Sequence, residues 1–339
     1  MKIVTFGEIM LRLAPSGYYR FNQVNEFGAT YGGGEANVAV SLANFGLDVS
    51  FVSKLPENII GQCAINDLRK YGVDTTHIVR GGERIGIYYL EKGASQRASQ
   101  VVYDRAHSSI STASFYDFDW NNIFNDCNFF HFTGITPALS EEVASICLEA
   151  CKKAKEKNIT VSCDLNFRNK LWSSAKANNT MSKLMEYVDI CIANEEDAEK
   201  VFGIKAQNNN VISGNLNEEE YIDVAKQLMK QFKFSYVAIT LRQSVSASDN
   251  VWSAMLYDGK EAYFSKKHSL RIVDRVGGGD SFGAGLIYSL INKFSPQKTI
   301  EFATSASALK HSIEGDYNHV SVKEVLDLVD GNSSGRVQR

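Results

Sequence analysis

The chain has 339 residues, of which 44% are hydrophobic, and its formal net charge at pH 7 is −3. This length and composition suit one large α/β domain or a domain with an appended subdomain, and they argue against a disordered chain. The nearly balanced charge offers no general attraction to nucleic acid or to an anionic membrane, so any anion must be bound locally. We therefore expect small-molecule partners, with no nucleic acid and no membrane.

The sequence also indicates where the protein works. Residues 1–7 predict an immediate first strand rather than a secretion signal, and no apolar run reaches the roughly 18 residues of a membrane span. The six cysteines are scattered without a Cys-x-x-Cys pair. Reduced thiols in a cytoplasmic protein are the expected consequence.

Strand-like runs alternate with amphipathic helical patterns along most of the chain. The strands are expected at residues 2–6, 49–53, 128–132, 160–164, 188–193 and 235–241, and the clearest helices at 141–156 and 218–230. This alternation predicts a mainly parallel sheet with helices on both faces. In such sheets ligands bind outside the carboxyl ends of the strands.

Two segments, residues 11–31 and 77–103, break this rhythm with short β-like runs. Together they predict a small β-sheet lid inserted into a single domain of residues 1–330, followed by a tail of residues 331–339. A lid could exclude water from a reaction site. A pair of ordinary surface hairpins is the alternative, with about equal weight on this evidence alone.

The first glycine turn is Gly32–Gly34, which enters an apolar helix. By itself it is a weak signal. It fits a nucleotide loop, but the small residues Ala36, Ala39 and Ala43 favour a helix that packs closely on the sheet and points its N-terminus at a polyol or an acid.

Polar side chains also follow two predicted strands. Asp164, Asn166 and Arg168 alternate at one strand end, so that their side chains point the same way. Asn194 can cap the next helix, whose first turn contains Asp197. An ordinary cap with acidic first-turn residues explains the second motif equally well, but beside phosphates such acids can hold magnesium through water.

The most informative segment is residues 274–285, where Gly277–Gly279 and Asp280 open an apolar helix. Adjacent glycines and a helix N-terminus make an anion site, and a carboxylate there is useful as a base for a hydroxyl that attacks a phosphate. No Lys follows the glycines and Phe282 replaces a required Gly, which excludes both common phosphate loops. A glycine turn with an N-capping Asp is the bland alternative.

Taken together, these motifs resemble those of ribokinase-like sugar kinases of the PfkB family, and the match runs nearly end to end. Within the family, the chain is most similar to 2-keto-3-deoxygluconate kinases, which share the Gly-Gly-Gly-Glu-Ala-Asn run at residues 32–37, the Tyr-x-Arg pair Tyr103 and Arg105, and the run Asp-Arg-Val-Gly-Gly-Gly-Asp at 274–280. The resemblance implies a three-layer sandwich with a mainly parallel central sheet and a small lid, and phosphorylation of a sugar acid.

The resemblance also implies a role for each site residue. Asp280 would be the base, and the amides of Gly277, Gly278 and Gly279 would stabilise the transferring phosphoryl group. The sugar-acid pocket would be lined by Gly34, Tyr89, Tyr103, Arg105, Arg168, Asp280 and Asp316. The nucleotide side would comprise Asn166, Asn194, Leu241, Arg242, Gly277 and Gly279. The implied cofactors are ATP and Mg²⁺, with a monovalent cation as a further candidate, and we expect a homo-oligomer.

Two motifs depart from the family. Asp197 stands where the family has a longer Glu, and residues 241–248 lack the glycines usual in the nucleotide loop. These departures leave the reach to magnesium and the phosphate donor open. A fructokinase or ribokinase acting on a neutral sugar is the alternative, followed by a non-catalytic sugar- or nucleotide-binding regulator. Asp280 disfavours the regulator, because binding alone needs no base.

Overall fold

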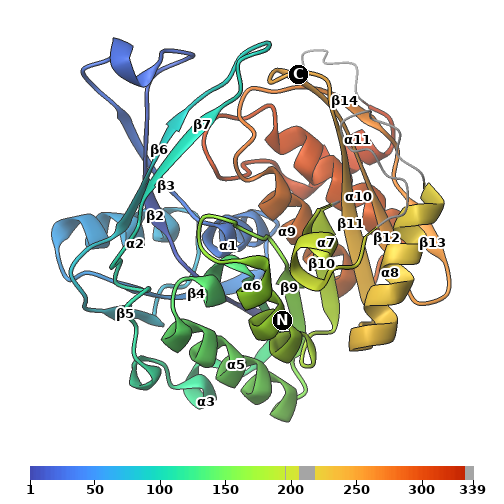
Figure 1. Ribbon diagram of the computed structural model, residues 1–339, viewed down its shortest axis with the longest axis horizontal. Coiled ribbons are helices and arrows are strands. Elements are labelled where there is room, and N and C mark those ends of the chain that lie inside the picture. Colours follow the sequence, from blue (N-terminus) through green and yellow to red (C-terminus); the bar gives the residue numbers. More distant parts are fainter. Residues whose placement is uncertain (195, 206–217, 333–339) are drawn as a thin grey trace.

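The computed structural model describes residues 1–194, 196–205 and 218–332 and contains two β-sheets (Figure 1). In the larger sheet the strands are ordered β13-β12-β11-β10-β9-β8-β1-β4-β5, with β14 also paired to β12. Their bounds are β1 Lys2–Phe6, β4 Asp48–Leu55, β5 Ile78–Arg80, β8 Cys127–Thr133, β9 Thr160–Asp164, β10 Ile190–Asn194, β11 Tyr236–Ser244, β12 Asp249–Tyr257, β13 Ala262–Phe264 and β14 His268–Arg271.

The strands from β5 to β11 are parallel, and β12, β13 and β14 extend that sheet in the antiparallel sense. The central strands are almost wholly buried, as parallel strands covered on both faces must be. All six predicted strands are present, and β1 and β9 have the predicted bounds. The predicted α/β fold with a mainly parallel sheet is confirmed.

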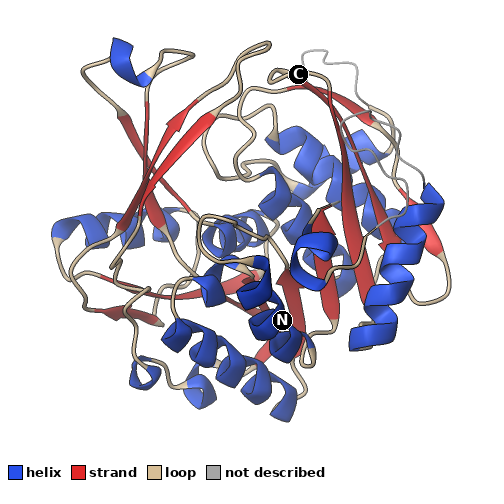
Figure 2. Cartoon of the chain, in the orientation of Figure 1, coloured by secondary structure: helices blue, strands red, loops and turns tan. Residues whose placement is uncertain are grey.

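Helices cover both faces of the larger sheet (Figure 2). One face carries α1 Gly34–Asn44, α2 Ile59–Lys70, α9 Gly278–Ile291, α10 Pro296–Lys310 and α11 Val322–Val329. The other carries α3 Trp120–Ile123, α4 Ile135–Ala138, α5 Glu141–Glu156, α6 Ser174–Met185, α7 Asp197–Phe202 and α8 Glu218–Phe232, and two short 3₁₀ helices span Phe21–Gln23 and Phe115–Asp117. Each face buries its own apolar cluster, so the sheet is the middle layer of three.

Local chemistry explains the helix starts. The Ser140 side chain accepts the amide of Val143, and Glu141 and Glu142 lie in the first turn, where acids favour the helix dipole. Helix α5 therefore begins and ends where its apolar periodicity predicts. Ser295 caps α10 in the same way, with Pro296 in the first turn.

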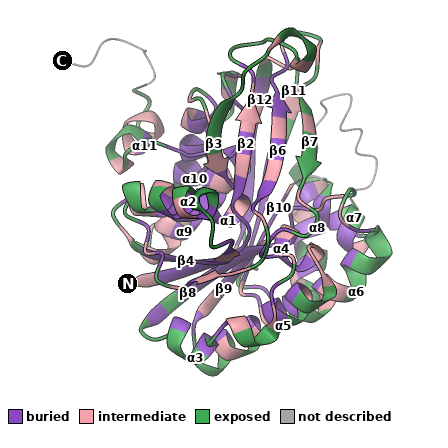
Figure 3. Cartoon of the chain, turned by 90° about the vertical axis from the view of Figure 1, so that its left-hand side faces the viewer, coloured by how far each residue is buried: buried purple, intermediate pink, exposed green. Residues whose placement is uncertain are grey.

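The smaller sheet has the order β3-β2-β6-β7 and projects from the body of the molecule (Figure 3). Its strands are β2 Met10–Ala14, β3 Gly28–Gly32, β6 Gly86–Glu91 and β7 Gln100–Asp104. Both predicted lid segments thus contribute to one sheet, in which β2 and β6 are parallel. The predicted start of the second segment at residue 77 is wrong, because β5 pairs with β4 in the larger sheet.

Among the residues that the structure describes, no helix is long and apolar enough to cross a membrane. The predicted tail of residues 331–339 lies almost entirely outside the described residues.

Candidate active site

A cavity of about 410 Å³ lies where the carboxyl ends of β9, β10 and β11 meet the N-termini of α1 and α9, with the smaller sheet along one side. Most of the predicted site residues line it, although they come from distant parts of the chain. Those residues are Gly34, Tyr103, Arg105, Asn166, Arg168, Asn194, Asp197, Arg242, Gly277, Gly278, Gly279, Asp280 and Asp316. This is the strand edge at which the sequence predicts ligand binding.

Two predicted residues do not line the cavity. Tyr89 lies on the other face of the small sheet, where its ring is 6.0 Å from that of Phe27, and its neighbour Tyr88 lines the cavity instead. Leu241 is buried, whereas Thr240 and Arg242 reach the cavity. Both corrections have one cause, because successive side chains of a strand point to opposite faces.

The C-terminal glycine turn has the geometry of an anion site. Gly277 adopts a left-handed conformation with φ 81°, and α9 begins at Gly278. A Cβ on Gly277 would lie 1.9 Å from the carbonyl oxygen of Asp316, so only glycine fits there. At Gly279 nothing lies within 4 Å of such a Cβ, so the start of α9 is open to the cavity at this residue, whereas the amide of Gly278 donates to the carbonyl of Arg275 at 3.4 Å.

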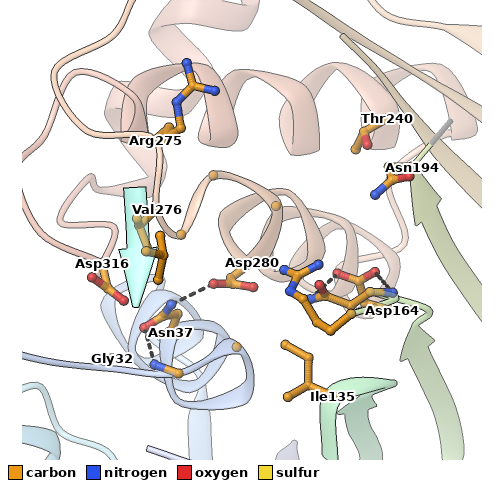
Figure 4. A pocket seen from close by; sticks show the side chains of 18 of the residues that line it. Gly32, Asn37, Ile135, Asp164, Asn194, Thr240, Arg275, Val276, Asp280 and Asp316 are labelled. Carbon is orange, nitrogen blue, oxygen red and sulfur yellow. Dashed lines mark hydrogen bonds between the residues drawn. The ribbon is translucent and has the colours of Figure 1, made fainter. Parts of the chain in front are cut away.

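Asp280 lies in the first turn of α9 and faces the same cavity (Figure 4). Asn37 of α1 donates from Nδ2 to Asp280 Oδ2 at 2.6 Å. The pKa of Asp280 is raised to about 6, chiefly by desolvation and to a lesser extent by the nearby Asp316, while the bond from Asn37 and the charges of Arg168 and Lys310 oppose this rise. Asp280 can therefore accept a proton near neutral pH.

The first glycine turn brings a second carboxylate close by, but it is sequestered. Glu35 in the first turn of α1 is buried, and its Oε1 accepts the amide and the hydroxyl of Thr133 at 2.9 and 2.8 Å and the hydroxyl of Thr136 at 2.6 Å. Burial raises the pKa of Glu35 to about 7. It ties α1 to the end of β8 and does not line the cavity.

The end of β9 and the start of α7 each place a carboxylate in the cavity lining, the half-buried Asp164 and the buried Asp197. The oxygens of Asp197 accept the amides of Phe167 and Asn194 at 3.0 and 3.1 Å, and burial raises the pKa of both carboxyls. Among the described residues no cluster of three or more metal-ligating side chains occurs. A magnesium ion carried by phosphates needs only one or two carboxylates.

Arg105 and Arg168, two of the four arginines that line the cavity, differ in their partners. Arg105, at the end of β7, forms an ion pair with the buried Glu8, and its Nε atom has no hydrogen-bond partner within the described parts of the chain. Arg168 donates to the carbonyl of Phe167 at 3.0 Å, and none of the ion pairs in the described residues involves it. Spare guanidinium donors thus point to an acidic ligand.

A buried ionic network that sequence analysis did not predict supports the cavity wall. Arg12 of β2 contacts Asp274 at 2.5 Å and Asp316 at 2.7 Å, and the hydroxyl of Tyr88 donates to Asp316 at 2.5 Å. An arginine in the short apolar run of residues 10–14 is the signal that could have revealed it. The network joins the small sheet to the segment that precedes the C-terminal glycine turn.

The chain is similar in sequence and fold to several known proteins. The crystal structure of 2-dehydro-3-deoxygluconokinase from Thermotoga maritima is 52% identical, with a TM-score of 0.94 over 98% of both chains. A 2-dehydro-3-deoxygalactonokinase from Haloferax volcanii is 30% identical over 98% of both chains, and a 2-dehydro-3-deoxygluconokinase from Bacillus subtilis is 26% identical over 95% of this chain and 93% of its own. The family of pfkB carbohydrate kinases matches residues 1–322, and the protein therefore belongs to this family of carbohydrate kinases.

Proposed function

We propose that this carbohydrate kinase transfers the γ-phosphoryl group of ATP to 2-keto-3-deoxygluconate and forms its 6-phosphate. The observation that carries the proposal is the position of Asp280, which lies at the N-terminus of α9 in a cavity that is also lined by Arg105 and Arg168. The names of the relatives from Thermotoga maritima and Bacillus subtilis support the same substrate.

In this proposal Asp280 accepts the proton of the sugar hydroxyl as its oxygen attacks the γ-phosphorus. Asn37 holds the carboxylate in place through the bond to Oδ2, which leaves Oδ1 for the hydroxyl. The phosphorus–oxygen bond to ADP breaks as the new bond forms, and the open amides of α9 stabilise the charge on the transferred group. Gly277 is the turn residue that sets the direction of these amides.

The residues at the strand ends fit a nucleotide triphosphate. Asn166, Asn194, Thr240, Arg242 and Arg275 line the part of the cavity beside α9. They offer amide, hydroxyl and guanidinium donors where phosphates and a ribose need them. Mg²⁺ would be held by the phosphates and, through water, by Asp197, and when bound it would neutralise charge on the phosphate oxygens. A monovalent cation and a homo-oligomer also belong to the proposal, but no residues are assigned to either.

The sugar carboxylate is assigned to Arg105 and Arg168, beside Tyr103. Arg105 is held by Glu8, and the Tyr103 ring lies 5.5 Å from its guanidinium carbon. Such a preorganised guanidinium recognises a planar carboxylate well. The 4-epimer, 2-keto-3-deoxygalactonate, is a second candidate, because the Haloferax volcanii relative is named for it.

A panel of substrates tests the proposal in one coupled ADP-release assay. The panel contains 2-keto-3-deoxygluconate, 2-keto-3-deoxygalactonate, fructose and ribose. We expect kcat/KM for a 2-keto-3-deoxy sugar acid to exceed that for either neutral sugar by at least about 10²-fold, since a site with charged donors rejects a ligand that leaves them unpaired. Equal activity on fructose or ribose would favour the neutral-sugar kinase, and no turnover with any of them would favour the regulator.

The small sheet is part of the same proposal, as a lid over the sugar. It contributes Met10, Tyr88, Val101 and Tyr103 to the cavity wall, and β7 is largely exposed on the outside. We expect saturating sugar acid to slow amide exchange in β6 and β7 more than in α5, because lid closure orders the strands. Equal protection of the lid strands and α5 would mean that the small sheet does not close over the sugar and is a fixed wall of the cavity.

A further inference from the structure

Lys310 is a buried charged group that the proposed mechanism leaves unused. It is the last residue of α10, its side chain is fully buried, and its Nζ donates to the carbonyl of Ile313 at 3.1 Å. Burying an ammonium is costly, so a site that keeps one commonly has a use for its charge. Nothing in the cavity lining assigns Lys310 a contact with a ligand.

Lys310 lies directly behind the anion loop. A Cβ on Gly277 would be 3.3 Å from Lys310 Cε. The end of α10 is held against the start of α9, because Ser307 donates to the carbonyl of Gly278 at 2.7 Å and the amide of Val273 donates to His311 at 2.8 Å. The negative end of the α10 dipole therefore points at a loop that must bind anions.

The buried charges behind the loop do not balance without Lys310. Asp274 and Asp316 are buried behind it, and Arg12 pairs with both, which leaves one negative charge in excess. The ammonium of Lys310 makes the four-group set Arg12, Lys310, Asp274 and Asp316 neutral. An uncompensated buried carboxylate at this place would repel a phosphoryl group at the loop.

We propose that Lys310 is an electrostatic positioning residue: a cation built into the protein that neutralises the carboxylates behind the anion loop, so that the loop can hold the triphosphate. The inference rests on the proposed function, since it takes the anion to be the phosphoryl group of ATP. In this proposal the positive charge behind the loop comes from the protein itself. Activity then need not rely on a free monovalent cation at this position.

The charge of Lys310 also reaches the proposed base. The groups that face it are Arg12 on β2, Asp274 before α9, Asp280 on α9, His311 after α10, and Asp316 and His319 in the segment before α11. Desolvation lowers the pKa of Lys310, while Asp274 and Asp316 raise it. Lys310 in turn lowers the pKa of Asp280, so removing the ammonium should raise the pKa of Asp280.

The test compares Lys310→Met, which keeps length and loses charge, with Lys298→Met, which removes an exposed charge from the same helix. For Lys310→Met we expect kcat and the affinity for β,γ-imido-ATP, measured by calorimetry, each to fall by about tenfold or more. The acid limb of kcat/KM against pH should move up by at least about half a unit. Lys298→Met should match the wild type in all three.

A double variant separates charge from structure. Lys310→Met with Asp274→Asn restores neutrality, and the new amide keeps an oxygen that can accept the amide of Val276. We expect the double variant to recover most of the nucleotide affinity and the wild-type acid limb. A double variant weaker than Lys310→Met, or a Lys310→Met enzyme with unchanged affinity and acid limb, would overturn the inference.

Two further outcomes keep the test decisive. If Lys310→Met does not fold, Asp274→Asn alone tests the inference, because it changes the buried charge in the opposite direction. With one positive charge in excess, this variant should bind the ATP analogue at least as tightly as the wild type. Weaker binding would contradict the inference. Failure of the proposed function would be recognised separately, because the Asp280→Asn variant would then keep its activity.

Discussion

The two glycine-rich turns, residues 32–34 and 277–279, each start a helix and reach the same cavity, yet they work differently. A Cβ on Gly33 would lie 1.9 Å from the carbonyl oxygen of Glu8, and one on Gly32 would lie 2.1 Å from a carboxylate oxygen of Asp316. Gly279 has open space instead. Glycine thus allows close packing at Gly32 and Gly33 of the first turn and at Gly277 of the second, and it allows access at Gly279.

The carboxylates of the two helices differ in the same way. Glu35 is enclosed by Thr133 and Thr136, whereas Asp280 faces the cavity and receives one bond from Asn37. Burial raises the pKa of both, so a shifted pKa alone does not identify the base. Access to the cavity distinguishes them, and the first turn contributes Asn37 to orient the carboxylate of the second.

Replacing the proposed base should have the largest effect. We expect Asp280→Asn to lower kcat by about 10²–10⁴-fold with little change in sugar binding, because the amide keeps the shape but accepts no proton. The measurement is kcat by coupled assay and the sugar Kd by calorimetry. If more than about a third of kcat remains while chemistry limits the rate, Asp280 is not the base.

The pH dependence of the wild type checks the same group. Because burial raises the pKa of Asp280 to about 6, its carboxylate is protonated below that pH. We therefore expect kcat/KM to fall as the pH drops through about 6, with the acid limb absent from the residual activity of Asp280→Asn. An acid limb near pH 4 would mean that the carboxylate is not desolvated in the free enzyme.

Next in size is the effect of the arginine on the sugar side. Arg105→Ala should reduce the preference for sugar acid over fructose by about tenfold or more, chiefly through KM of the acid, because a charge-assisted pair is lost. Arg84→Ala is a suitable control. Arg84 pairs with Asp104, the residue directly before Arg105, but it does not line the cavity. An unchanged preference would move the carboxylate site to Arg168 alone.

The two turns themselves can be separated by one methyl group each. Gly33→Ala should destabilise the protein by about 1–3 kcal/mol, because the methyl group meets the backbone at Glu8. Gly279→Ala should leave the melting temperature unchanged or higher but lower kcat by about tenfold, because the methyl group enters the anion site. The measurements are the melting temperature and kcat of both variants. If Gly279→Ala destabilises the protein as much as Gly33→Ala does, the two glycines do not differ as described.

The smallest expected effect concerns two adjacent tyrosines of the lid. Tyr88→Phe removes a bond to the buried Asp316 and should cost about 1–2 kcal/mol in the free energy of unfolding. Tyr89→Phe should stay within about 0.5 kcal/mol, since its ring lies on the opposite face, against Phe27. Similar values from urea unfolding would mean that the alternation along β6 does not separate their roles.

Much of this protein could be predicted from its sequence because the signals are local. Period-two and helical patterns located β1, β9 and α5, and the cap at Ser140 explains where α5 begins. The glycines and Asp280 predicted an anion site with a base, since that chemistry depends on adjacent residues. The family then followed from several such motifs in order along the chain.

Only the tertiary structure decided which neighbours meet across the chain. Tyr88 rather than Tyr89 lines the cavity because the register of β6 against β2 and β7 sets which face turns inward. The partners of Arg12 lie 262 and 304 residues away, so no local pattern could pair them. Burial by such distant segments shifted the pKa of Asp280 and placed Lys310 behind the loop, because desolvation depends on everything that packs around a group and not on its sequence neighbours.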